Sequence, residues 1–168
     1  MSLREYLLEN RDELLEEWFS LIWNDYPDES ISYINRKKDQ FANPLRYHIT
    51  SGISALFDLF LQNPQFDHEK TVNALEEIVK IKAVQDFSPS QALSFIFKFK
   101  NTLRKLYLEN KIEEVNLEEL FHFESLIDQA GLTAFDIFMR CREKVYDIKA
   151  EEIKRSTYML LRKSQQVS

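Results

Sequence analysis

The twenty residues IKAVQDFSPSQALSFIFKFK, at positions 81–100, join two helical patterns through a short junction. Ser88 is placed to accept a hydrogen bond from the Gln91 amide, and the Gln91 side chain can reach back to the Ser88 amide, as in a capping box. Pro89 stands at the first helical position, where its missing N–H removes no helical hydrogen bond. The junction therefore predicts that one helix ends near Asp86 and that another begins at Pro89.

The helix that follows, over about 89–109, carries apolar residues on nearly every side. A helix of this kind is either central in a domain or covered by a partner. We therefore regard its phenylalanines as core residues or as contacts of a dimer. The candidate interface residues are Phe95 and Phe99 here, with Phe138, Val145 and Ile148 further along the chain.

Start and stop signals of the same type divide the rest of the chain. Asn43 and Pro44 predict a helix start, because asparagine accepts hydrogen bonds from free amides and proline suits the first turn. A capping box at Ser2 and Glu5 and another at Asn116 and Glu119 mark two further starts. The expected helices cover 3–24, 29–38, the segment from Asn43-Pro44 to Asn63-Pro64, 68–85 behind Asp67, 89–109 and 117–163.

The last helical pattern is long and contains Gly131 but no proline. We expect one long helix, bent near Gly131, rather than two helices that join there. The apolar spacing is regular through Ile148 and then shifts, and the following residues are rich in charge. Residues 149–168 are therefore interpreted as a helical extension that is exposed or forms a dimer coil.

Composition supports an all-α, single-domain bundle of about six helices spanning 1–168. The chain has 168 residues, 44% of them hydrophobic and 30% charged, which is typical of a globular domain. It contains two glycines and four prolines, too few for the many turns of an all-β fold. A globin-like arrangement is one form that such a bundle can take.

Charge and hydropathy argue against two classes of partner. The formal net charge is −6, whereas nucleic-acid-binding domains usually carry a basic excess. The one compact basic cluster, Arg36-Lys37-Lys38, is interpreted as solvated surface. No apolar run approaches the roughly 20 residues that span a bilayer. A single cysteine excludes an internal disulfide and fits a reducing cytosol. We expect no nucleic-acid or membrane partner.

The residues that could carry chemistry do not form a known catalytic pattern. His48, His68 and His122 lack zinc spacing, and Glu119-x-x-His122 is only half of a di-iron motif. The sequence therefore predicts no enzyme, no metal and no cofactor. The alternative is a globin-like sensor, with haem held by His48 or His122 or with a small apolar ligand.

Three small residues leave alternatives open. Gly52 and Gly131 lie inside helical patterns, where each costs about 1 kcal/mol relative to alanine. Both indicate close approach of helices, but Gly52 could instead leave room for a small ligand beside His48. Cys141, between Arg140 and Arg142, is interpreted as a buried structural thiol rather than a reactive one.

The chain resembles the N-terminal domain of RsbT co-antagonist proteins, the RsbRD type. The resemblance runs through Trp18, Tyr26-Pro27, FANPLRYHITSGISALFDLF at 41–60, IKAVQDFSPSQALSFIFKFK at 81–100 and IDQAGLTAFDIFMRCREKVYDIKAEEIKR at 127–155. It covers nearly the whole chain, and the segments at 41–60 and 81–100 are its most specific parts.

This resemblance implies a helical, dimeric sensory or regulatory module of bacterial stress signalling, in the cytoplasm. In the family, such a domain precedes a STAS output domain that controls RsbT-like switch kinases. The present sequence ends at Ser168 without room for a STAS domain, so we expect a stand-alone version or a fragment of a longer chain. The expected partners are a second copy and a protein of the signalling pathway, and the resemblance supplies no catalytic residues.

Overall fold

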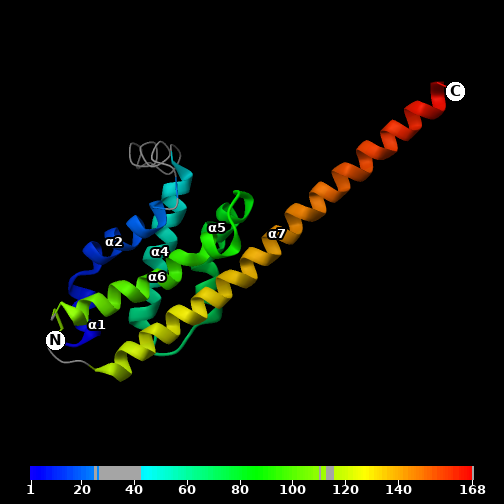
Figure 1. Cartoon of the computed structure of the whole chain (residues 1–168). Coiled ribbons are helices and arrows are strands. Elements are labelled where there is room, and N and C mark those ends of the chain that lie inside the picture. The colour runs from blue at the N-terminus through cyan, green and yellow to red at the C-terminus, as the bar shows by residue number, and fades with distance from the viewer. Residues whose placement is uncertain (25, 27–42, 110, 113–115, 168) are drawn as a thin grey trace.

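The computed structural model describes residues 1–24, 26, 43–109, 111–112 and 116–167. Every regular element within these residues is an α-helix (Figure 1), which confirms the all-α prediction. The predicted helix over 29–38 and the cluster Arg36-Lys37-Lys38 lie outside the described residues. The helices are α1 (Leu3–Glu9), α2 (Arg11–Trp23), α4 (Pro44–Gln62), α5 (His68–Val84), α6 (Pro89–Leu108) and α7 (Leu117–Val167).

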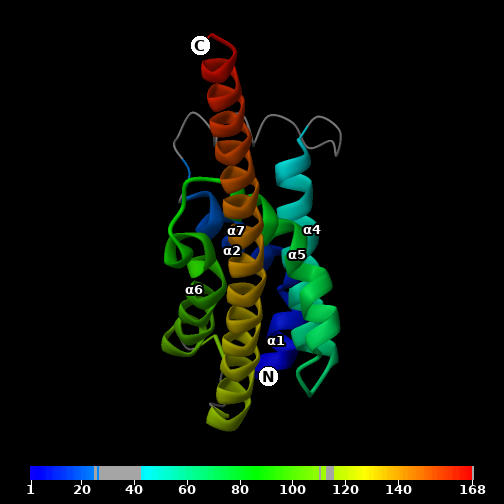
Figure 2. The same cartoon turned by 90° about the vertical axis from the view of Figure 1, so that its right-hand side faces the viewer.

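The longest element, α7, has 51 residues and runs without interruption through Gly131. Its N-terminal half packs against α5 and α6, while α4 packs against α5. Figure 2 shows α7 in front, with α6 on one side and α4 and α5 on the other. In both views the C-terminal half runs past the other labelled helices. Residues 149–167 are thus helical, and their side chains are exposed.

The first predicted helix, over 3–24, is divided in the structure. Asn10 has φ −107° and ψ 24°, outside the α-helical region, and it separates α1 from α2. Its side-chain amide donates at 2.9 Å to the carbonyl oxygen of Tyr6, which also accepts from the Asn10 backbone N–H at 3.0 Å. The capping box at Ser2 and Glu5 is present as predicted. The single-helix prediction was wrong because the apolar pattern continues through a residue that favours helix ends.

Helix starts lie where the local signals indicate. The Asn43 side chain accepts from the Arg46 amide at 3.1 Å, with Pro44 in the first turn, and Asp67 accepts from the Lys70 amide at 3.0 Å. Ser88 and Gln91 form both hydrogen bonds of the capping box, at 3.2 and 3.0 Å, and Pro89 begins α6.

Replacing Ser88 by alanine removes the acceptor for the Gln91 amide. We expect the free energy of unfolding to fall by about 1 kcal/mol, the usual cost of losing an N-cap. Urea unfolding checks this value. Ser88→Thr is the matched control, because threonine keeps an acceptor and should stay close to the wild-type stability. Identical unfolding of the alanine variant and wild type would contradict the capping role.

The centre of the core is built around α6. The indole of Trp18 donates to the carbonyl oxygen of Phe95 at 2.9 Å and stacks on the ring of Phe99, with centroids 4.1 Å apart. Phe95, Phe99 and Phe138 are 0%, 2% and 1% exposed, so they are core residues of a single chain. As candidates for a dimer interface, all three are already covered by packing within the chain.

The remaining two interface candidates lie beyond the core on α7. Val145 is half-buried, and Ile148 is 61% exposed. Phe97 is the exception among the phenylalanines of α6, since 39% of it is exposed whereas Phe95 and Phe99 are buried. Among the described residues, no helix is long and apolar enough to cross a membrane.

Candidate functional site

The α5–α6 junction is held from outside by α7. Arg142 donates through Nη2 to the carbonyl oxygens of Gln85 and Phe87, at 2.9 and 2.5 Å. Its guanidinium also lies over the Phe138 ring, 4.8 Å from the centroid. These carbonyls follow the end of α5 and precede the capping box of α6. One arginine therefore ties the junction to the point where α7 leaves the bundle.

A lysine lies under the same junction. Lys82 is fully buried, and its Nζ lies 5.1, 5.0 and 5.5 Å from the ring centroids of Tyr26, Phe87 and Phe95. Such contacts stabilise a cation through the negative faces of the rings. The Tyr26 hydroxyl donates to the Gln85 side chain at 3.0 Å. We call Tyr26, Lys82, Gln85, Phe87, Phe95 and Arg142 the junction cluster.

The apolar pattern did not reveal the junction cluster. Lys82 falls on the buried stripe of α5, and Arg142 drew notice only as a neighbour of Cys141. A lysine in the middle of an apolar stripe is the signal that could have indicated a buried cation. Cys141 itself is half-buried against the core, while Arg142 is bonded to the junction carbonyls.

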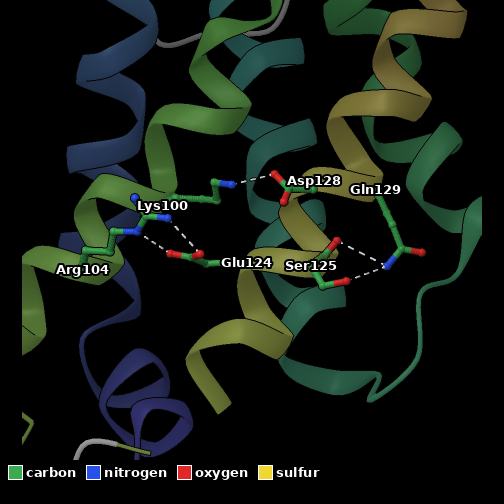
Figure 3. Close-up of polar contacts among 6 residues, drawn as sticks. All are labelled: Lys100, Arg104, Glu124, Ser125, Asp128 and Gln129. Carbon is green, nitrogen blue, oxygen red and sulfur yellow. Dashed lines mark hydrogen bonds and ion pairs between the residues drawn. The ribbon is translucent and has the colours of Figure 1, made fainter. Parts of the chain in front are cut away.

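Ion pairs join α6 to α7 farther from the junction, as Figure 3 shows. Arg104 donates to both carboxylate oxygens of Glu124, at 2.5 and 3.0 Å, and Lys100 Nζ lies 2.8 Å from Asp128. Hydrogen bonding from Arg104 lowers the pKa of Glu124 below its usual 4.5. These pairs fix the two helices side by side at the surface.

The Arg104–Glu124 pair predicts a pH dependence of stability. Because the folded-state pKa of Glu124 is lowered, its contribution is fully present above the unfolded value and is lost as pH falls through the folded value. We expect Glu124→Gln to be less stable than wild type at neutral pH and the difference to shrink below pH 4.5. Urea unfolding from pH 7 to pH 3 tests this, with Glu143→Gln, an exposed acid on α7, as control. A difference that stays constant over this range would contradict it.

An open apolar groove separates the outer edges of α6 and α7. It has a volume of about 660 Å³ and is lined on the α7 side by Gly131, Leu132 and Phe135. The Phe97 ring of α6 lies directly over Gly131, where a Cβ atom would come within 2.6 and 2.7 Å of two ring carbons. Phe97 can lie this close to α7 because Gly131 has no side chain.

The residues that the structure describes fill the space at Gly52, where the sequence left room for a small ligand beside His48. A Cβ atom on Gly52 would overlap the carbonyl oxygen of Ala74 and lie 2.5 Å from Cδ1 of Ile78. Gly52 therefore serves the close approach of α4 and α5, the other alternative for this residue. His48 is half-buried next to the Tyr47 ring. A hollow of about 510 Å³ lies nearby, between α2 and α4, but neither predicted residue lines it.

Glu119, from the half di-iron motif Glu119-x-x-His122, has a structural role. The Glu119 carboxylate accepts from the amides of Leu3 and Arg4, at 3.1 and 3.0 Å, and so caps α1 from α7. The Asn116 side chain accepts from the Glu118 and Glu119 amides. The start of α7 therefore has the N-cap hydrogen bond of the predicted capping box, while the Glu119 side chain is used at α1. His68 and His122 are exposed. No group of three metal-ligating side chains occurs within the ranges that the structure describes.

The exposed half of α7 carries large apolar side chains in water. Tyr146, Ile153 and Leu160 are 58%, 66% and 69% exposed. A chain segment with this many exposed apolar groups is typical of an interaction site. We call residues 146–167 the arm.

The described residues thus form a helical bundle with a cation-clamped junction and an exposed helical arm. The chain belongs to the RsbT co-antagonist protein rsbRD N-terminal domain family, whose model matches residues 12–153. This is the family that the segments at 41–60 and 81–100 predicted, and it is a regulatory signalling domain of the stressosome type. Searches among curated proteins and among solved structures found no match.

Proposed function

We propose that the chain is a non-catalytic input module of bacterial stress signalling that acts in the cytoplasm as a homodimer. Family membership supports the signalling role. Within the described residues, polar side chains such as those of Arg142 and Glu119 are engaged in structural contacts, which fits a module without chemistry of its own. In this proposal, the output is a conformational change that a protein of the same pathway recognises.

The division of α7 into two halves carries the proposal. Its first half contributes core residues from Leu120 to Phe138, and its second half is exposed. A continuous helix has an unbroken hydrogen-bond ladder, so a shift of the buried half displaces the exposed half as one rod. Arg142 stands at the boundary and contacts the junction. A change in the junction cluster would therefore reach the arm through this residue.

Sedimentation velocity over a wide range of protein concentration tests the dimer. We expect a single species with twice the mass of the chain, because the arm exposes apolar side chains that a second copy can cover. A strict monomer at the highest concentration would overturn the homodimer. Circular dichroism on the same samples establishes that the helices are folded.

A second candidate is a sensor of a small apolar ligand, including a globin-like sensor of haem. The α6–α7 groove is the observation that favours it, since ligand pockets are concave and mostly apolar. Absorption spectroscopy and mass spectrometry of protein purified from its native host test this candidate. A Soret band or a retained apolar compound would support it, and protein with neither would favour the module without a ligand.

A further inference from the structure

The arm carries a regular seam of uncharged residues. Positions spaced alternately by four and three residues are Tyr146, Ala150, Ile153, Thr157, Leu160, Ser164 and Val167. Eight residues of 146–167 are charged, and none of them falls on these seven positions. All seven are exposed on a continuous helix. This spacing, 3.5 residues on average, is the one by which two helices pair along their length.

The opposite face of the arm does not share this property. Ile148 and Met159 are 61% and 53% exposed, but Glu152 and Arg155 lie between them on the same face. Burying that face would desolvate two charges, which costs energy unless each is paired. The seam is therefore the face of the arm that a partner helix can cover at the least cost.

Large and small residues alternate regularly along the seam. The bulky positions, Tyr146, Ile153, Leu160 and Val167, recur every seven residues, and the small ones, Ala150, Thr157 and Ser164, lie between them. In a parallel pair, equivalent positions face each other, so small residues would meet small ones and leave gaps. In an antiparallel pair, bulky positions face small ones, so Ile153, Leu160 and Val167 can each pack against a small residue of the second copy.

Charges beside the seam favour the same direction. A parallel pair would place Lys149 next to Lys154 of the second copy, twice by symmetry, and such like-charge pairs weaken association. An antiparallel pair in which Ala150 faces Val167 of the second copy places Lys154 next to Leu161 and Lys163 next to Ser156. The long lysine stems can cover these neighbours while their ammonium groups stay in water.

We propose that two copies of this chain pair through their arms in antiparallel orientation, with the seam buried between them. The pairing rests on the homodimer of the proposed function and specifies its surface and direction. Thr157 faces Leu160 of the second copy, Ile153 faces its Ser164, and Ala150 faces its Val167. The two bundles then lie at opposite ends of the paired arms.

Disulfide trapping tests both the surface and the direction. All variants carry Cys141→Ser, and Ala150→Cys and Val167→Cys are made separately and together. A disulfide requires Cα atoms about 4.4–6.8 Å apart. In the antiparallel pair, Ala150 is about 25 Å from its own copy along the helix. We therefore expect a covalent dimer from the double variant and almost none from either single variant. Arg155→Cys, which points away from the seam, is the matched control and should give no covalent dimer.

The other outcomes distinguish an error in the surface or direction of pairing from an error in the proposed homodimer. Covalent dimers from both single variants would overturn the antiparallel direction and leave a parallel dimer. A dimer in sedimentation that gives no disulfide in any variant would overturn the seam and leave dimerisation through another surface. A monomer in sedimentation would overturn both proposals. Circular dichroism checks that each variant is helical, so that a missing disulfide is not caused by unfolding.

Discussion

Replacing Gly52 by alanine is expected to lower the free energy of unfolding by about 1–3 kcal/mol. In an open helix the same change would raise stability by about 1 kcal/mol, because alanine is the better helix former. Here the added methyl group would overlap the carbonyl oxygen of Ala74 and press on Ile78. The carbonyl belongs to the backbone of α5, so relief requires α4 and α5 to move apart.

Gly131→Ala is the matched control within the same chain. Its methyl group would meet the far end of the Phe97 ring, on a side chain that is 39% exposed and can swing outward. We expect the gain in helix propensity to offset most of this displacement, so stability should change little. Urea unfolding of both variants gives the comparison. Equal effects of the two changes would contradict the distinction between a backbone contact and a side-chain contact.

Arg142→Met is expected to lower the free energy of unfolding by about 1.5–3 kcal/mol, the range for hydrogen bonds that involve a charged group. Methionine can still pack on Phe138 but cannot donate to the carbonyl oxygens of Gln85 and Phe87. Both junction carbonyls then lose the arginine donor, and the oxygen of Gln85 keeps only its bond from the Phe87 amide. The junction should open locally more often, because its contact with α7 is gone.

Urea unfolding measures the loss of stability, and hydrogen exchange measures the local opening. The amide of Phe87 donates to the carbonyl oxygen of Gln85 at 2.9 Å, so its exchange should become faster. Arg140→Met is the control, since Arg140 is exposed and makes only a 3.5 Å contact with the backbone of Asp136. If Arg142→Met lost no more stability than Arg140→Met and left the exchange of the Phe87 amide unchanged, Arg142 would not stabilise the contact between α7 and the junction.

Local signals in the sequence predicted most helix ends. Asn43, Asp67 and Ser88 each cap the helix that follows them, because a cap depends on residues within one turn. The break at Asn10 was missed, since the same apolar stripe continues on both sides of it. Local pattern therefore fixes where helices begin more reliably than where a continuous stripe is interrupted.

Contacts between distant segments could not be predicted in the same way. Glu119 was expected to complete a local capping box, but its carboxylate caps α1, more than a hundred residues away. Lys82 and Arg142 both contact Phe87, and they come together there only because α5 and α7 pack against each other. The phenylalanines of α6 were open to two explanations because an all-round apolar helix is equally compatible with a core and with an interface.

The most direct test of the account is sedimentation velocity of a variant with a charged seam. Ile153→Asp together with Leu160→Asp should convert the dimer to a monomer, since both side chains would be buried between the arms. Thermal unfolding of the bundle should stay close to wild type, because both positions are exposed in the single chain. Ile148→Asp, an equally exposed residue off the seam, should remain dimeric. A double variant that stays dimeric would contradict pairing through the arm.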